Sequence, residues 1–411
     1  MNATKEDFQA DLCVVGGAGH VGLPLAIVFA SKGLKVMIHD VNAAAWETIR
    51  SGKMPFMEAG AEPLLKDVLA KGRLAFSSDP AALRGVPKVI ITIGTPLDEY
   101  FNPVFKGFQR FLDASAPHMD QTRLIVLRST VAPGTTEWLQ RELHRRGLKA
   151  QLAFCPERIV QGFAVQELQK LPQIVSGTTD QAASEATELF QLITREVIHV
   201  SPTEAEFAKI FCNVYRYVQF AIANQFYMVA DAAGVDYSRI LEACKRHYPR
   251  LQDMPGAGFA AGPCLLKDTM TLVAFARNQF SLGHAAMMVN EGLVLYLVEK
   301  MAKEYDLPNM TVGLLGMAFK GESDDTRASL SYKLKKFLTI RSRRILTADP
   351  YVTTDPDILP VERVIADSDV LVLCTPHKQY RNLDLRGKPL VDVWGCHRDD
   401  GKGSGQPCRE A

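Results

Sequence analysis

Short apolar runs alternate with segments of helical periodicity from the start of the 411-residue chain to about residue 200. The runs are rich in Val, Ile and Leu and end at Gly, Ser, Asp or Pro; they read DLCVVGG, KVMIHD, KVIITIG, RLIVLRST, QLAFCPE and VIHVSP. Helical periods lie between several of them, for example over residues 63–71 and 136–145. This alternation predicts a parallel sheet with helices covering its faces.

The pattern changes near Pro202, where helical periodicity replaces it as far as about Lys303. Residues 204–233 contain neither Pro nor Gly, which predicts one long helix. Strand–helix alternation resumes after Asn309, with strands predicted in TVGLLGMAF, RRILTADP, DVLVLCT and PLVDVWG. The fold class is therefore predicted to be α/β, with a helical region between two α/β regions.

Composition and charge indicate an ordinary globular protein and give no sign of a nucleic-acid-binding or membrane-spanning one. The chain is 47% hydrophobic and 23% charged, as in ordinary globular proteins. Its 47 Lys and Arg balance 46 Asp and Glu, so nothing in the overall charge predicts a nucleic-acid partner. The most apolar long stretch, residues 214–234, includes Arg216 and other polar side chains, so no membrane span is expected.

Eight cysteines are scattered along the chain without a CxxC pair, and several lie inside apolar runs. This distribution favours thiols in a reducing compartment over a disulfide framework. A cytoplasmic location is therefore expected.

A dinucleotide fingerprint follows the first predicted strand. Residues 12–24 read LCVVGGAGHVGLP, with the spacing Gly17-x-Gly19-x-x-Gly22 and a helical stretch after it. The first glycine permits the tight turn, the second lets the backbone approach a pyrophosphate, and the third allows the helix to pack on the strand. A glycine-rich turn without a cofactor is the alternative. The strand–turn–helix context favours a Rossmann-like domain with bound nucleotide.

The second predicted strand, KVMIHD, ends at Asp40. An acid near this spacing binds ribose hydroxyls and disfavours a 2′-phosphate. The expected cofactor is therefore NAD rather than NADP.

A cysteine ends an unusual loop in the helical region. Residues 254–268 read MPGAGFAAGPCLLKD, and the Gly, Ala and Pro residues before Cys264 let backbone approach a ligand. If a helix starts after Pro263, its dipole favours the Cys264 thiolate, and Lys267 and Asp268 lie on the same side of that helix. A structural cysteine in a capped helix is the alternative. Together with NAD, a nucleophilic thiolate predicts aldehyde oxidation through a thiohemiacetal and a thioester.

Seven ordered motifs resemble the UDP-sugar 6-dehydrogenase family, which includes UDP-glucose and UDP-N-acetylhexosamine dehydrogenases. They are GGAGHVGLP, GTPLDE, RSTVAPGTT, CPERIVQG, EAEFAKIFCN, GPCLLKD and GMAFKGESDDTR, and the resemblance covers nearly the whole chain, from Leu12 to about Gly395. The resemblance implies two successive NAD-dependent oxidations of a UDP-sugar C6 alcohol to a carboxylate, a uronic acid of the kind used in polysaccharide biosynthesis.

The resemblance also implies a role for single residues. Cys264 matches the nucleophile, Lys209 the lysine that stabilises an oxyanion, and Asn213 its hydrogen-bonding neighbour one helical turn later. Asp268 matches the acid of proton transfer and water activation, and Thr130 the threonine that orients a water. Further implied residues for catalysis and substrate binding are Glu157 (thioester hydrolysis), Arg158, Lys320 and Arg327. Implied cofactor-binding residues are Gly17, Gly19, His20, Val21, Gly22, Asp40, Thr95 and Thr130. No metal site is predicted. The alternatives are a solvated helix charge for Lys209, strand-end caps for Thr130 and Glu157, and a local salt network for Lys320 and Arg327.

The substrate signals conflict. Pro156-Glu157-Arg158 and the HYPR of residues 247–250 resemble the N-acetylhexosamine branch, whereas GPCLLKD keeps Lys267 and Asp268 as UDP-glucose enzymes do. The favoured substrate is a UDP-N-acetylhexosamine, and UDP-glucose stays open. A two-electron hydroxy-acid dehydrogenase and a non-enzymatic nucleotide sensor are further alternatives, distinguished by an NADH yield of two, one or zero per substrate.

Three domains are expected: an NAD-binding Rossmann domain at 1–201, a helical dimerisation region at 202–300, and a Rossmann-like UDP-sugar-binding domain at 301–411. The two Rossmann-like domains are thus joined by a helical middle region with a long central helix. The expected partners are the UDP-sugar and a second copy of the chain, paired through the central helix.

Overall fold

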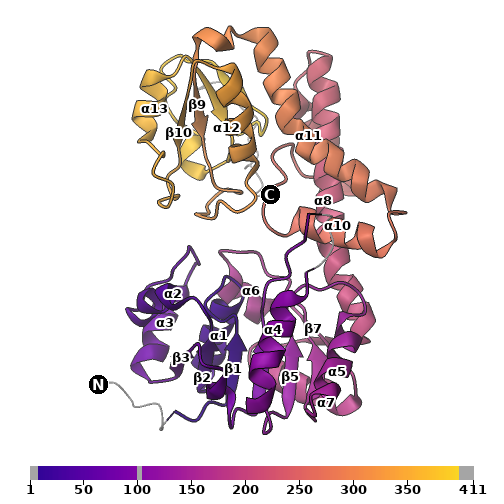
Figure 1. Cartoon of the computed structure of the whole chain (residues 1–411). Coiled ribbons are helices and arrows are strands. Elements are labelled where there is room, and N and C mark those ends of the chain that lie inside the picture. Colours follow the sequence, from indigo (N-terminus) through magenta and orange to yellow (C-terminus); the bar gives the residue numbers. More distant parts are fainter. Residues whose placement is uncertain (1–7, 100–103, 398–411) are drawn as a thin grey trace. The chain divides into compact units, whose positions relative to one another are not determined.

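The computed structural model describes residues 8–99 and 104–397 and divides into two compact units, Met1–Cys212 (unit 1) and Asn213–Ala411 (unit 2). Both contain a parallel sheet with helices, and the predicted helical region lies between the sheets in the sequence (Figure 1). The α/β fold class is therefore confirmed.

The sheet of unit 1 has eight strands in the order β3-β2-β1-β4-β5-β6-β7-β8. Their bounds are β1 (Leu12–Val15), β2 (Val36–His39), β3 (Leu74–Ser77), β4 (Lys88–Ile91), β5 (Leu124–Leu127), β6 (Gln151–Phe154), β7 (Gln173–Gly177) and β8 (Val197–His199). All neighbours are parallel except β6 and β7. The six predicted strands are present, whereas β3 and β7 were not predicted. The order of the first six strands is that of a dinucleotide-binding sheet.

Helices cover both faces of this sheet because alternate strand residues point to opposite faces. Leu12 and Val14 belong to one core cluster, with residues of α1, α3, α6 and α7, while Cys13 and Val15 belong to another, with residues of α4 and α5. The helices are α1 (Gly22–Ser31), α2 (Ala43–Arg50), α3 (Ala61–Ala70), α4 (Lys106–Ser115), α5 (Thr135–Arg145), α6 (Ala164–Lys170) and α7 (Asp180–Gln191), with 3₁₀ turns η1 (Pro80–Leu83) and η2 (Ala116–His118).

The long helix predicted over 204–233 is α8 (Pro202–Ala232). Its first turns are anchored in unit 1 by Glu206, whose carboxylate accepts the N–H groups of Gly134 at 2.6 Å and Thr136 at 2.7 Å. This carboxylate therefore caps the N-terminus of α5. Burial raises the pKa of Glu206.

The sheet of unit 2 has four parallel strands in the order β10-β9-β11-β12. They are β9 (Thr311–Leu315), β10 (Arg344–Ala348), β11 (Val370–Leu373) and β12 (Leu390–Asp392), the four that the sequence predicts. The helices are α9 (Tyr237–Lys245), α10 (Leu265–Phe275), α11 (Ser281–Glu304), α12 (Leu330–Arg341) and α13 (Val361–Asp367), with 3₁₀ turns η3 (Pro249–Leu251), η4 (Leu307–Asn309) and η5 (Lys378–Tyr380).

By length and composition, α11 is the one helix in the described ranges that could cross a membrane, which the sequence analysis did not single out. A core helix passes the same test. Leu293, Val294 and Leu297 of α11 are fully buried in a core cluster with residues of α12 and β9. These residues of α11 therefore belong to the core of unit 2.

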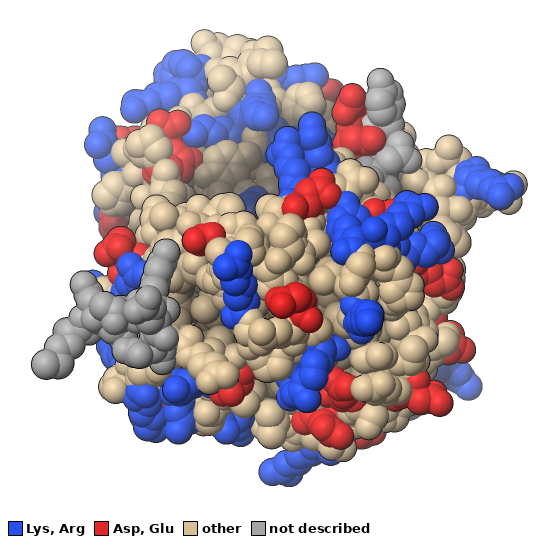
Figure 2. Space-filling model, turned by 60° about the horizontal axis from the view of Figure 1, so that its bottom comes forward, with Lys and Arg blue, Asp and Glu red and all other residues tan. Residues whose placement is uncertain are grey.

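Figure 2 shows Lys and Arg in several small groups and Asp and Glu scattered among them, with wide uncharged areas between. Among the cysteines, Cys13, Cys155 and Cys374 are buried thiols, as expected, whereas Cys396 is disulfide-bonded, which was not expected.

Candidate functional site

The fingerprint glycines lie in the turn between β1 and α1, and two of them are required by the protein's own packing. A Cβ atom on Gly17 would stand 2.6 Å from the carbonyl oxygen of Val14, and one on Gly22 would stand 2.4 Å from that of Gly16. A Cβ on Gly19 would meet nothing closer than 3.4 Å. Packing thus explains Gly17 and Gly22, while Gly19 leaves open the backbone surface that a pyrophosphate needs.

Asp40 follows β2 and closes this turn. Its Oδ2 accepts the N–H of Ala18 at 3.0 Å, and its Oδ1 accepts the N–H of Asn42 at 2.9 Å. The carboxylate therefore stands beside the glycine turn, where an acid binds ribose hydroxyls. The turn, the N-terminus of α1 and Asp40 together fit NAD.

The remaining predicted cofactor residues surround the carboxyl ends of β1, β4 and β5. Val21 is the N-cap residue of α1, and the ring of His20 stacks on Phe56 with centroids 4.0 Å apart. Thr95 donates its hydroxyl to the carbonyl oxygen of Thr130 at 2.5 Å. The structure thus brings Thr95 and Thr130 together at the sheet edge where parallel α/β folds bind ligands.

Glu157 follows β6 and is held on both oxygens. Its Oε2 forms an ion pair with the fully buried Arg128, and its Oε1 accepts the N–H groups of Arg158 at 2.7 Å and Ile159 at 3.0 Å. Arg128 also donates to the side chain of Gln173 at 3.0 Å. The Glu157 side chain therefore fixes the chain where it leaves β6, and the guanidinium of Arg158 donates to the carbonyl of Pro172.

The predicted loop before Cys264 is packed tightly inside unit 2. A Cβ atom on Gly258 would stand 2.2 Å from the ring of Trp394, and one on Gly262 would stand 2.7 Å from the ring of Phe319. The N–H of Gly262 also donates to the carbonyl of Ala328 at 3.2 Å. Gly262 thus allows a close approach to the segment after β9, and Gly258 allows one to the segment after β12.

Cys264 is the exposed N-cap residue of α10, which begins one residue later, at Leu265. Its carbonyl accepts the N–H of Asp268 at 2.9 Å. The buried thiol of Cys155 differs, because burial raises its pKa to about 12. Cys264 therefore has both the solvent access and the helix-terminus position that a nucleophile needs.

A polar cluster lies one turn into α10. Asp268 is buried, its Oδ2 accepts the amide N–H of Asn213 at 2.5 Å, and its Oδ1 pairs with the ammonium of Lys267. Lys209 precedes Asn213 on α8 by one turn, so the two lie on one helix face. The structure thus brings Asn213 and Asp268 together as hydrogen-bonded partners, with Lys267 on the other carboxylate oxygen.

The predicted substrate-binding cations lie between β9 and α12. Lys320 is only 4% exposed. Arg327 donates through Nε to both oxygens of Asp325 at 3.0 Å, and this hydrogen bonding raises its pKa. A negative charge on Cys264 also raises the pKa of Arg327.

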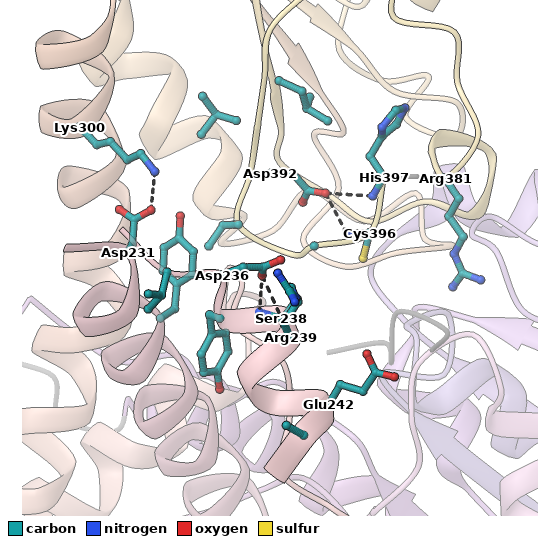
Figure 3. Close-up of a pocket in the computed structure, with 18 of the residues that line it drawn as sticks. Asp231, Asp236, Ser238, Arg239, Glu242, Lys300, Arg381, Asp392, Cys396 and His397 are labelled. Atoms are coloured by element: carbon teal, nitrogen blue, oxygen red, sulfur yellow. Dashed lines mark hydrogen bonds and ion pairs between the residues drawn. The ribbon is translucent and has the colours of Figure 1, made fainter. Parts of the chain in front are cut away.

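One cavity of unit 2, of about 860 Å³, is not lined by any predicted site residue. Asp231, Lys300, Asp236 and Asp392 line it (Figure 3), where Asp231 pairs with Lys300 and Asp236 caps α9. Its polar groups largely bond to one another. Among the residues described, no three His, Cys, Asp or Glu side chains are grouped as metal ligands.

The sequence analysis missed three buried polar residues that shape these regions: Arg128, Asp349 and His377. Asp349 follows β10 and His377 follows β11, and they lie 3.1 Å apart. Their positions after two predicted strands of one parallel sheet are the signal that could have found them, because such strand ends meet at one edge.

Comparisons with known proteins match the whole of this architecture. Residues 10–194 match the NAD binding domain of the UDP-glucose/GDP-mannose dehydrogenase family, residues 203–292 its central domain and residues 313–399 its UDP binding domain. The UDP-N-acetyl-D-mannosamine dehydrogenase of Pyrococcus horikoshii is 32% identical, over 92% of this chain and 93% of that protein.

Two other relatives bear different names. The NDP-N-acetyl-D-galactosaminuronic acid dehydrogenase of Ralstonia nicotianae is 28% identical, over 93% of this chain and 95% of that protein. A solved structure of a UDP-glucose dehydrogenase from Pyrobaculum islandicum superposes with a TM-score of 0.87 at 28% identity and covers 96% of both chains.

Proposed function

The chain belongs to the UDP-glucose/GDP-mannose dehydrogenase family, and we propose that its substrate is a UDP-N-acetylhexosamine, oxidised at C6 to the uronic acid. It is an NAD-dependent oxidoreductase that acts on a UDP-sugar. The observation that carries the choice of sugar is the similarity, over nine tenths of the chain, to an enzyme named for UDP-N-acetylmannosamine. Pro156-Glu157-Arg158 supports the same branch.

Bound NAD supplies a hydride acceptor in each of two oxidations. The alcohol first becomes an aldehyde. The Cys264 thiolate then adds to the aldehyde carbon and gives a thiohemiacetal, which loses hydride and becomes a thioester. Water cleaves the thioester to the carboxylate and restores the thiol. The thiol adduct is required because the carbonyl carbon of a free aldehyde cannot give up its hydrogen as hydride until a nucleophile has added to it.

In unit 2, we assign Asp268 to proton transfer and to the activation of water. Its hydrogen bond from Asn213 and its ion pair with Lys267 support this assignment, because they orient a buried carboxylate one turn from Cys264. Asn213 also donates to the oxyanion in the proposal. Lys320 and Arg327 bind the UDP-sugar, and the hydrogen bond from Gly262, two residues before Cys264, to the carbonyl of Ala328, next to Arg327, supports this role.

In unit 1, we assign Lys209 to the oxyanion and to substrate binding, Thr130 to the orientation of a water, and Glu157 to thioester hydrolysis. The ion pair with Arg128 is compatible with the carboxylate form that a general base requires. Arg158 is assigned to substrate binding. The glycine turn, His20, Val21, Asp40, Thr95 and Thr130 bind NAD in this proposal.

UDP-glucose is the second candidate substrate. Lys267, three residues after Cys264, matches the UDP-glucose form of the motif, and it pairs with Asp268. The structure of the Pyrobaculum islandicum UDP-glucose dehydrogenase is also similar over almost the whole chain.

A panel of UDP-sugars assayed by NADH production tests the proposal. We expect the highest kcat/KM with a UDP-N-acetylhexosamine, with UDP-N-acetylmannosamine the first to test, and two NADH per sugar consumed. A higher kcat/KM with UDP-glucose would establish the second candidate. One NADH per sugar would indicate a two-electron dehydrogenase instead.

We also propose that the chain forms a homodimer through α8. Five large side chains on this helix are exposed: Phe211, Tyr215, Ile222, Phe226 and Val229. At 100° per residue they fall within about 60° of one helix face. Tyr215 is 65% and Val229 62% exposed, and a continuous apolar stripe of this kind marks an interaction surface. Tyr215→Lys is expected to convert a dimer to a monomer in light scattering.

Two further assignments are proposals of the same kind. The matches at 10–194, 203–292 and 313–399 support three domains with boundaries near residues 201 and 300. The free thiols of six described cysteines support a cytoplasmic location, whereas the disulfide of Cys396 is of the kind found in oxidising compartments.

A further inference from the structure

Two buried side chains restrain the segment that follows β9. Asp349 is 9% exposed, and its Oδ2 accepts the N–H groups of Met317 at 2.6 Å and Ala318 at 2.9 Å. His377 is fully buried, with its Nε2 3.1 Å from the same oxygen. The carboxyl ends of β10 and β11 thus hold the start of this segment from two sides.

The second ring nitrogen of His377 extends the restraint four residues along the segment. Its Nδ1 accepts the N–H of Glu322 at 3.1 Å, so Nε2 carries the proton and donates to Asp349. The rings of Tyr351 and Tyr380 lie edge-on to the imidazole, with centroids 5.1 Å and 5.5 Å away. They fix the plane of the ring, and the two hydrogen bonds fix its tautomer.

Glu322 is held in a backbone conformation that it would not adopt readily alone. Its φ is +52°, in the left-handed region where a Cβ atom is unfavourable. Besides the bond to His377, its carboxylate accepts the N–H of Lys378 at 2.8 Å and the hydroxyl of Tyr351 at 3.2 Å. Strain of this kind persists where the surroundings over-determine the backbone, as at ligand-binding segments.

The restrained points lie on both sides of the buried Lys320. Ala318 is fixed before it by Asp349, and Glu322 is fixed after it by His377. The segment continues to Ala328, also at positive φ, whose carbonyl accepts the N–H of Gly262 from the loop of Cys264. Displacement of Glu322 would therefore move Lys320.

We propose that His377 is a positioning residue for UDP-sugar binding: by accepting the N–H of Glu322, it holds the segment of Lys320 in the conformation that binds the nucleotide. His377 itself does not touch the substrate in this scheme. The inference rests on the proposed role of Lys320 in substrate binding.

Two isosteric variants separate the two hydrogen bonds of the ring. In His377→Asn the side-chain oxygen takes the place of Nδ1 and keeps the bond from Glu322. In His377→Gln the amide nitrogen takes the place of Nε2 and keeps the bond to Asp349, but leaves the N–H of Glu322 without an acceptor. An unsatisfied buried N–H should weaken binding about tenfold.

We expect His377→Gln to raise the Kd for UDP in calorimetry, and the KM for the UDP-sugar, about tenfold, and His377→Asn by less than about threefold. The KM for NAD and kcat should stay near their wild-type values in both variants, and Tm should fall no further in His377→Gln than in His377→Asn, because each variant loses one buried hydrogen bond. Unchanged UDP affinity in His377→Gln, or equal weakening in both variants, would overturn the proposal. A parallel loss of Tm and NAD affinity would also overturn it, because that indicates a general structural role.

If His377→Gln does not fold, a second pair of variants tests the same step at Glu322. Asn tolerates positive φ, whereas the β-branched Val does not. Glu322→Val should then bind UDP more weakly than Glu322→Asn, and equal affinities would overturn the proposal. UDP binding can be measured without turnover. The positioning role of His377 can therefore fail while the proposed reaction holds, and the proposed reaction can fail while the positioning role holds.

Discussion

The two sheets carry an acidic residue at the same place, but the two carboxylates are used differently. Asp40 follows β2 and accepts an N–H from the turn after β1, while Asp349 follows β10 and accepts two N–H groups from the turn after β9. Asp40 is only half-buried, and within the described ranges its carboxylate accepts main-chain N–H groups alone. Asp349 is buried and bonded to His377.

This difference shows how one framework serves two binding tasks. In unit 1 the acid stands at an open glycine turn, where it is available to the hydroxyls of a dinucleotide ribose. In unit 2 the turn contains Met317 and Ala318 instead of the glycine fingerprint, and the acid stabilises the protein itself. We therefore infer that unit 2 uses side chains of the segment after β9 for its nucleotide, rather than the acid.

The largest expected effect comes from the glycine turn. Gly19→Ala adds a methyl group that meets no protein atom closer than 3.4 Å, so the protein should fold normally. The same methyl group would lie where the pyrophosphate approaches. We expect NAD affinity to fall about ten- to hundredfold, as overpacking of this kind predicts, with Tm unchanged. Fluorescence titration with NADH measures it.

Gly22→Ala is the matched control for this prediction. Its Cβ would lie 2.4 Å from a main-chain oxygen, which cannot move aside as a side chain can. We expect it to lower the free energy of unfolding by about 2 kcal/mol. If Gly19→Ala instead lowers stability and leaves NAD affinity unchanged, the claim that Gly19 serves NAD binding and Gly22 serves packing is wrong.

The acid of unit 1 should set the choice of cofactor. Asp40→Asn removes the negative charge and keeps one acceptor oxygen for the turn. We expect the preference for NAD over NADP to fall about tenfold, because the repulsion of the 2′-phosphate is lost. The ratio of kcat/KM values measures the preference. Equal kcat/KM with both cofactors in the wild type would contradict the role of Asp40.

The acid of unit 2 should affect stability and leave cofactor choice unchanged. Burial alone would raise the pKa of Asp349, but the hydrogen bond from His377 and those from the N–H groups of Ala318 and Tyr351 lower it below its ordinary value. A lowered pKa stabilises the folded state above the unfolded-state value, and this stabilisation is lost as the pH falls below about 4.

Asp349→Asn lacks this stabilisation at every pH. Its free energy of unfolding should therefore be lower than that of the wild type at pH 7 and should change less between pH 7 and pH 3. Urea denaturation at the two pH values measures both. A variant whose acid sensitivity equals that of the wild type would show that Asp349 is not the responsible group.

Much of the framework was predictable because its strands are continuous Val, Ile and Leu runs. The strand β3 was missed because its apolar run, Leu74 to Phe76, is only three residues long, and only its two end residues, Leu74 and Ser77, are buried. The strand β7 was missed, and its antiparallel direction depends on pairing with β6, which local sequence does not specify. Long-range pairing therefore limits prediction more than local propensity does.

Prediction of the candidate site is limited in the same way, because local spacing can be read from the sequence and long-range pairs cannot. The spacing of Cys264, Lys267 and Asp268 is local, so one helix start was enough to predict it. The ion pair of Arg128 with Glu157 joins residues 29 positions apart, and the hydrogen bond of His377 to Asp349 joins residues 28 positions apart. No short motif contains such pairs, because the order of strands in each sheet brings their carboxyl ends together.

The central claim is that Cys264 carries the sugar between the two oxidations, and intact-protein mass spectrometry during turnover tests it most directly. In Glu157→Gln, where hydrolysis of the thioester should be slow, we predict a burst of NADH and a sugar adduct on the peptide that contains Cys264. Cys264→Ala should form no adduct and no acid. Unmodified protein throughout turnover, with Cys264→Ala still producing acid at the wild-type rate, would contradict the account.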